Sequence, residues 1–231
     1  MGIEAIREVI QERYPLGSLA LKKLETYVSL IERAPSNLTA WRGEAIWERG
    51  VLDSLAIWPI LGSSGGMALD VGSGAGFPGL VLAVARPEWE WTLVESRSRR
   101  GAFLEEAVRA LALSNVQVVV ARAEEWIRVD ERQRERFDVV TLRAVARTRA
   151  ALELGLPFVR LGGKMVLVKG FEGLREVEAE RQWLEKLGGA VSAWVEGSVS
   201  DVRGRRDQLV VLGKVSQTPG EYPRGAPKLG T

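Results

Sequence analysis

Two amino acids are missing from the 231-residue sequence, which contains no histidine and no cysteine. The lack of cysteine excludes disulfides and thiolate nucleophiles, and the lack of histidine excludes imidazole bases; together they exclude most zinc sites. The sequence also has no apolar run near the roughly 18 residues that a membrane span needs, and no apolar segment with a cleavage site at its N-terminus. We therefore expect a cytoplasmic protein with no membrane association and no bound metal.

Charge of either sign is in little excess, because 32 basic residues face 30 acidic ones and the net charge is only +2. This balance is too even for indiscriminate attraction to a polyanion. The basic residues are nevertheless unevenly placed, since residues 139–170 contain Glu153 as their one acid. The same stretch carries the bases Arg143, Arg147, Arg149, Arg160, Lys164 and Lys169. The sequence thus predicts a local positive surface.

The chain divides into three parts by composition. Residues 1–64 have apolar positions at spacings of three and four, which predicts a helical extension. Residues 65–214 alternate between short β-rich runs and helical patterns, and residues 215–231 contain three prolines, which favours an extended tail. With 46% hydrophobic residues the middle part can bury a proper core.

The alternation in residues 65–214 predicts a Rossmann-like α/β fold with a seven-stranded, mostly parallel sheet and a closing hairpin at one edge. The expected strands are residues 67–71, 91–94, 116–120, 137–142, 164–168, 191–195 and 208–212. The expected helices are residues 77–85, 99–113, 123–127, 145–159 and 174–187.

A glycine-rich loop follows the first expected strand, where Asp70 is followed by glycines at positions 72, 74, 76 and 79. Glycines let backbone N–H groups approach a ligand closely, and the start of the next helix favours negative charge. Read from the strand end, the pattern is acidic-x-G-x-G-x-G, which is typical of methyltransferases. It predicts S-adenosylmethionine contacts at Gly72, Gly74 and Gly76. Read from Gly74, the same residues also fit the dinucleotide pattern G-x-G-x-x-G.

Carboxylates follow the next two strands. Glu95 ends the second strand, where its side chain can accept hydrogen bonds from both ribose hydroxyls of an adenosine. Its alternative role is a surface ion pair with Arg97 or Arg99. Ala123 and Glu124 follow the third strand, where adenine lies in this architecture, although Glu124 also suits the first turn of a helix.

Basic residues follow the fourth strand. Arg143 could bind the carboxylate of the methionine moiety or a phosphate of the acceptor, and its alternative is a surface arginine at a strand end. The interpretation as an RNA-binding rim extends to Arg147 and Lys169. It also includes Arg203 and Arg206 in a later loop, although exposed loops are often basic without a specific role.

The missing residues also narrow the methyl acceptor. Methylation of pyrimidine C5 generally uses a thiolate, and the chain has no cysteine. The loop after the fourth strand reads Leu142-Arg143-Ala144-Val145 and lacks the Asn/Asp-Pro-Pro-aromatic pattern of adenine N6 methylation. Guanine N7 carries an in-plane lone pair, so its methylation requires alignment but no general base. The reaction therefore requires no general base, and the sequence leaves the catalytic residues unknown.

Taken together, these motifs resemble the bacterial 16S rRNA guanine-N7 methyltransferases, the family of RsmG or glucose-inhibited division protein B. The resemblance spans most of the chain and is carried by Asn37-Leu38-Thr39-Ala40, Leu52-Asp53-Ser54-Leu55, the loop at 70–79, Glu95, Arg99-Arg100, Phe103-Leu104, Arg122-Ala123-Glu124-Glu125, Phe137-Asp138, Arg143-Ala144-Val145-Ala146, Lys169-Gly170 and Tyr222-Pro223-Arg224. The chain departs from the family where Gly50 and the stretch 206–208 replace histidines.

The resemblance implies the class I S-adenosylmethionine-dependent methyltransferase fold, with cofactor contacts at Gly72, Phe77, Ala123, Glu124 and Arg143. It implies a guanine in the 530 loop of 16S rRNA, position 527, as the acceptor, either in RNA or in the small subunit. Two other hypotheses remain: a methyltransferase of small molecules with an enclosing lid, and a non-catalytic module that binds a nucleoside. We expect a monomer.

Overall fold

The computed structural model describes residues 2–34, 38–196 and 208–225. Its centre is one seven-stranded sheet in the order β3-β2-β1-β4-β5-β7-β6. Only β7 runs antiparallel to its neighbours β5 and β6. The strands are β1 (Gly66–Val71), β2 (Trp89–Glu95), β3 (Val116–Val120), β4 (Phe137–Arg143), β5 (Val159–Lys169), β6 (Gly189–Glu196) and β7 (Gln208–Lys214). The predicted mostly parallel sheet with a hairpin at its edge is confirmed.

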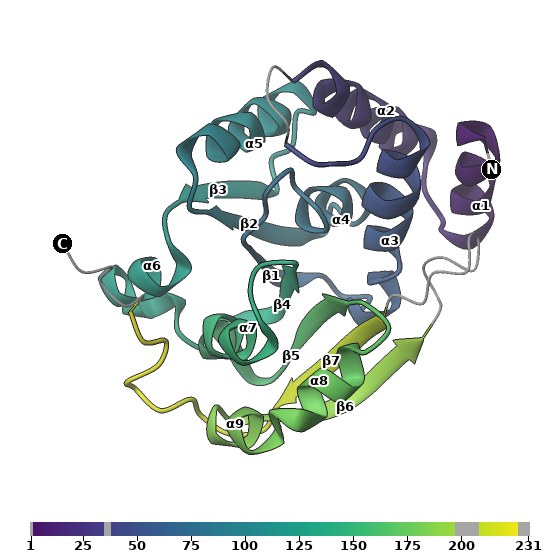
Figure 1. Ribbon diagram of the computed structural model, residues 1–231. Helices are drawn as coiled ribbons and strands as arrows, with labels where there is room; N and C mark the ends of the chain where they lie inside the picture. Colours follow the sequence, from purple (N-terminus) through teal and green to yellow (C-terminus); the bar gives the residue numbers. More distant parts are fainter. Residues whose placement is uncertain (1, 35–37, 197–207, 226–231) are drawn as a thin grey trace.

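Helices cover both faces of this sheet (Figure 1). The first group is α1 (Ile3–Arg13), α2 (Ser18–Arg33), a π-helical segment (Ile46–Leu52), α3 (Asp53–Leu55), a 3-10 turn (Trp58–Ile60), α4 (Gly79–Ala85) and α5 (Ser98–Ala110). The second group is α6 (Ala123–Val129), a 3-10 turn (Glu131–Gln133), α7 (Thr148–Gly155), a 3-10 turn (Leu156–Phe158), α8 (Gly173–Ala179) and α9 (Arg181–Lys186).

Each face of the sheet has its own apolar core, because neighbouring residues of a strand point to opposite faces. In β1, Ala68 packs in the core that contains the N-terminal helices, α4 and α5. Leu69, the next residue, packs in the core that contains α6 to α9. The N-terminal extension thus shares one continuous core with the sheet. In the part of the chain described here, no helix is long and apolar enough to cross a membrane.

Two predicted helices differ from the structure. The helix expected over 145–159 is shorter, because Pro157 lies in a 3-10 turn and the chain enters β5 at Val159, five residues earlier than expected. The helix expected over 174–187 is two helices that meet at Glu180, and nothing in the sequence marks that break.

The tail after β7 has no regular secondary structure up to residue 225, but it is firmly packed. Tyr222 is buried and meets Trp183 edge-on, with 5.2 Å between the ring centroids. Thr218 is also buried, and its hydroxyl donates to the carbonyl of Leu187 over 2.7 Å. The tail passes from the end of β7 beside α9 toward α6 (Figure 1).

Candidate cofactor site

The glycine loop lies between β1 and α4, at the switch point where the strand order reverses around β1. The backbone N–H groups of Gly72 and Ser73 both donate to the carbonyl of Val94 in β2, over 2.8 and 3.1 Å. Gly72 has φ +72°, and a Cβ there would lie 2.8 Å from Val145 Cγ2. Both the backbone conformation and the close approach therefore require glycine at this position.

Asp70, the acid that precedes the loop, is a buried structural group. Its Oδ1 accepts from the Thr141 hydroxyl of β4 over 2.7 Å, and its Oδ2 accepts from the N–H of Gly79, the first residue of α4, over 3.3 Å. Burial raises the pKa of Asp70 to about 6, against the opposing effect of these hydrogen bonds and of the Arg143 charge. Asp70 thus joins β1, β4 and α4 beneath the loop.

Glu95 is also buried, and it holds the glycine loop from the side. Its Oε2 accepts from the N–H of Gly74 over 2.9 Å, and its Oε1 accepts from the N–H of Arg97 over 2.8 Å. Neither contact is the surface ion pair considered as an alternative. Each carboxylate oxygen has two lone pairs, so hydrogen bonds from a ribose remain compatible with this arrangement.

A cavity of about 400 Å³ opens where β1, β2, β3 and β4 end. This volume lies within the range of roughly 300–1,000 Å³ typical of small-molecule sites. Three predicted cofactor residues line it, namely Gly72, Ala123 and Glu124. The other lining residues are Val71, Val94, Ser96, Ala121, Arg122, Val145, Ala146, Ala150, Glu153, Leu154 and Arg224. The walls are thus mainly small apolar groups with a few polar groups.

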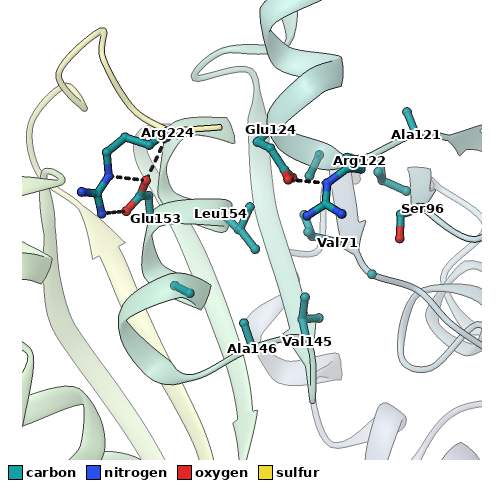
Figure 2. A pocket seen from close by; sticks show the side chains of 14 residues that line it. Val71, Ser96, Ala121, Arg122, Glu124, Val145, Ala146, Glu153, Leu154 and Arg224 are labelled. Atoms are coloured by element: carbon teal, nitrogen blue, oxygen red, sulfur yellow. Dashed lines mark hydrogen bonds and ion pairs between the residues drawn. The ribbon is translucent and has the colours of Figure 1, made fainter. Parts of the chain in front are cut away.

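The polar groups of the cavity lie in two places (Figure 2). On one side Arg122 Nε donates to Glu124 Oε1 over 2.6 Å, and the Glu124 side chain is nearly buried. On the other side Arg224 makes an ion pair with Glu153 of α7, with 2.7 Å between Nη2 and Oε2. Burial alone would raise the pKa of Glu153, but the hydrogen bonds and charge of Arg224 outweigh it and lower that pKa. Both carboxylates of the cavity are therefore paired with arginine.

The predicted cofactor residues Gly74, Gly76, Phe77, Glu95 and Arg143 are not among the described residues that line this cavity. The first four belong to the loop or support it. Gly76 has φ +102°, and the Tyr27 hydroxyl, which lies 2.6 Å from the position of a Cβ, donates to the carbonyl of Ala75. Helix α2 thus packs directly against the glycine loop.

Phe77 points into the N-terminal layer. Its ring centroid lies 5.4 Å from that of Tyr27 and 5.7 Å from that of Trp41. Gly50 lies directly against this ring, because a Cβ there would be 2.5 Å from Phe77 Cζ. The family that the sequence resembles often has histidine at position 50. Glycine at this position leaves room for the phenyl ring of Phe77.

Arg143 also turns toward the N-terminal layer. Its Nη2 lies 3.0 Å from Oδ2 of the buried Asp53, and its guanidinium lies over the Trp41 ring, 4.8 Å from the centroid. The alternative interpretation of Arg143 as a surface arginine is wrong, since its side chain is only 10% exposed, and its predicted role in binding the cofactor or RNA stays a prediction. The partner could not be foreseen, because Asp53 lies 90 residues earlier in the chain.

The predicted RNA-binding residues are separated by the structure. Lys169 Nζ lies 2.7 Å from the Thr148 hydroxyl and 2.9 Å from Glu176 Oε2, so its charge is paired between β5 and α8. Arg147 is exposed at the start of α7 and has no ion pair with the described residues. Arg203 and Arg206 lie outside the described residues.

The sequence reasoning missed two groups of cavity residues. Ala150, Glu153 and Leu154 follow helical spacing and form the face that α7 turns to the cavity, a signal that the sequence did contain, and Ala146 lines the cavity just before this helix begins. Arg224 has no such signal, because it reaches the cavity from a tail whose path depends on tertiary contacts.

Comparisons with known proteins show the family to which the chain is related. A model of the GidB family, described as rRNA small subunit methyltransferase G, matches residues 20–202. Ribosomal RNA small subunit methyltransferase G of Roseiflexus castenholzii is 43% identical over 189 residues, which cover 81% of this chain and 80% of the relative. The protein of the same description from Lactobacillus delbrueckii subsp. bulgaricus is 34% identical over 235 residues, covering 98% and 97%.

Solved structures share the fold at low sequence identity. The TYW2 protein of M. jannaschii in complex with AdoMet has a TM-score of 0.57 at 15% identity, covering 77% of this chain and 79% of its own. An rRNA methylase from Streptococcus thermophilus has a TM-score of 0.51 at 15% identity, covering 71% and 94%.

Proposed function

The chain belongs to the family of rRNA small subunit methyltransferase G, and we propose that it transfers a methyl group from S-adenosylmethionine to N7 of a guanine in the 530 loop of 16S rRNA, position 527. The observation that carries the proposal is the cavity at the carboxyl ends of β1 to β4, which joins the glycine loop to Ala123 and Glu124. The products are 7-methylguanosine and S-adenosylhomocysteine.

The cavity suits the cofactor in shape and polarity. A Cβ at Gly72 would meet Val145. The backbone of the loop can therefore lie against this wall of the cavity only because residue 72 has no side chain. Ala121, Ala123, Val145 and Leu154 provide apolar walls for a flat adenine ring. Glu95 stands beside the lining residues Val94 and Ser96, at the end of β2, with carboxylate oxygens that can accept from a ribose.

The cofactor supplies an electrophilic methyl group on its sulfonium. The protein's own residues have to orient it and exclude water, because the guanine N7 lone pair attacks without prior loss of a proton. A reaction that needs no general base is compatible with a chain that contains no histidine and no cysteine. The buried carboxylates Asp70 and Glu95 both support the loop and carry no part of the chemistry.

The acceptor approaches from the carboxyl edge, and exposed arginines support its phosphates. Arg97 and Arg99 are exposed where α5 begins beside the end of β2, and Arg147 is exposed where α7 begins after β4. Within residues 2–34, 38–196 and 208–225 these three make no ion pair, so their charges face solvent. Arg203 and Arg206 remain predicted RNA contacts, as does Lys169 if its ion pair with Glu176 opens. The monomeric state and the cytoplasmic location also remain proposals.

The decisive experiment is transfer of a radiolabelled methyl group from S-adenosylmethionine to small ribosomal subunits isolated from cells that lack the modification. The RNA is then digested and the labelled nucleoside identified. We expect label in 7-methylguanosine at position 527. Label on another base, or on small molecules but no RNA, would overturn the acceptor, and binding without transfer would indicate a nucleoside-binding module. Size-exclusion chromatography tests the monomer.

A further inference from the structure

The C-terminal tail contacts both helices that flank the cofactor cavity. α6 contributes Ala123 and Glu124 to the cavity, and α7 contributes Ala150, Glu153 and Leu154. No described hydrogen bond joins these two helices to each other. Two adjacent tail residues reach both of them, as the following contacts show.

The contact with α6 is made through Arg128. Its Nη2 donates to the carbonyl of Pro223 over 2.9 Å, and its guanidinium lies so close to Gly225 that a Cβ there would be 2.8 Å from Nη1. Arg134, which follows the 3-10 turn after α6, donates to the carbonyl of Tyr222. The α6 side of the cavity is thus held to tail residues 222–225.

The contact with α7 is made through Glu153. Its Oε1 accepts from the backbone N–H of Arg224 over 2.8 Å and from Arg224 Nε over 3.0 Å, and its Oε2 accepts from Nη2 over 2.7 Å. The Glu153 side chain is only 10% exposed and lines the cavity together with Arg224 (Figure 2). A forked arginine–carboxylate pair with a third hydrogen bond from the backbone fixes orientation as well as distance.

The tail is itself fixed between these contacts and helix α9. Tyr222 is buried against Trp183, and the Arg224 guanidinium lies over both rings, 5.2 Å from the Trp183 centroid and 5.6 Å from that of Tyr222. The tail therefore acts as a rigid link, because Pro223 binds α6 and Arg224 binds α7 one residue apart.

We propose that tail residues 222–224 are positioning residues of the cofactor site, which set the distance between α6 and α7, and that Arg224 also forms part of the cavity wall. Arg224 and Glu153 act together on α7, and Arg128 acts on α6. Cofactor affinity therefore depends on a segment outside the sheet and its helices. This inference rests on the proposed function, because it assigns the cofactor to this cavity.

The test is calorimetric titration of the full chain with S-adenosylhomocysteine at 25 °C. We expect Arg224→Ala to raise the Kd about tenfold, within the range typical of coupling between two sites. Arg224→Lys keeps the charge but loses the fork, so its Kd should rise less. Arg128→Ala should also raise the Kd. The Kd of the double variant should not exceed the higher of the two single-variant Kd values, because either change alone releases the same link.

Arg175→Ala is the matched control, since Arg175 is an exposed arginine that pairs with Glu172 within α8 and does not line the cavity. Its Kd should equal that of the unaltered chain. Thermal melts establish that each variant is folded at 25 °C. A lower melting temperature for Arg224→Ala with an unchanged Kd would overturn the inference and leave a purely structural tail. If the unaltered chain itself does not bind S-adenosylhomocysteine, the proposed function fails and the inference fails with it.

Discussion

Asp70 makes the stability of the protein depend on pH in a direction opposite to that of most carboxylates. The side chain is 1% exposed, and burial raises its pKa from 3.8 to about 6. The folded protein therefore holds a proton that the unfolded chain has released between these pH values. Stability from this group is complete below pH 3.8 and is lost as the pH rises to about 6.

The magnitude follows from the two pKa values. A difference of about two units corresponds to about 3 kcal/mol of unfolding free energy. Asp70→Asn mimics the protonated acid, because its amide can donate to the Thr141 hydroxyl and accept from the N–H of Gly79. The free energy of unfolding of the variant, minus that of the unaltered chain, should therefore rise by about 2.4 kcal/mol between pH 4 and pH 7, because the unfolded chain has already released part of its proton at pH 4.

The assay is urea unfolding of both proteins at half-unit steps between pH 4 and pH 7. Using the difference removes the contributions of the other carboxylates, which are common to both proteins; one of these is Asp138, whose pKa is lowered because the hydrogen bonds and charge around it outweigh its burial. Thr92→Ser serves as a control that should show a difference independent of pH, because Thr92 is the partner of Leu69 in β2 and its side chain lies on the opposite face of the sheet from Asp70. A flat difference for Asp70→Asn would refute the reasoning, because it would mean that Asp70 titrates alike in both states.

Three other changes test separate parts of the molecule. Gly72→Ala should weaken S-adenosylhomocysteine binding at least tenfold in calorimetry, because its Cβ would lie 2.8 Å from Val145 Cγ2 and its φ is +72°; an unchanged Kd would contradict the close approach. Lys214→Ala should lower the free energy of urea unfolding by roughly 3 kcal/mol, because this fully buried lysine bonds the carbonyl of Leu156 and pairs with Glu135; a loss under 1 kcal/mol would contradict that role. Arg147→Glu should weaken small-subunit binding and reduce the slope of log K against log salt, with cofactor affinity unchanged; filter binding at several salt concentrations would detect an unaltered slope, which would exclude Arg147 from the RNA contact.

Local sequence patterns were enough to predict the sheet and the position of the glycine-rich loop. The strands, the glycine register after Asp70 and the carboxylate at the end of β2 all depend on residues close together in the chain. The directions of long side chains were not predictable in this way. Arg143 lies at the carboxyl end of β4 as expected, but a buried acid 90 residues earlier and the Trp41 ring turn it inward.

The tail shows the same limit more clearly. Its prolines indicated an extended segment, and the segment up to residue 225 does lack helices and strands. Its path, however, is determined by Arg128, Glu153 and the Trp183 ring, all of which are distant in sequence. Composition predicts that such a segment is irregular, but the partners that fix it become visible only in the folded protein.

Two contacts join the N-terminal helical layer to the glycine loop. The Tyr27 hydroxyl donates to the Ala75 carbonyl, and Gly50 packs on the Phe77 ring. The N-terminal helical layer thus covers the glycine loop directly. It therefore cannot be exchanged for an unrelated cap without rebuilding the loop beneath it. A displacement of helix α2 would therefore also displace the backbone of the glycine loop.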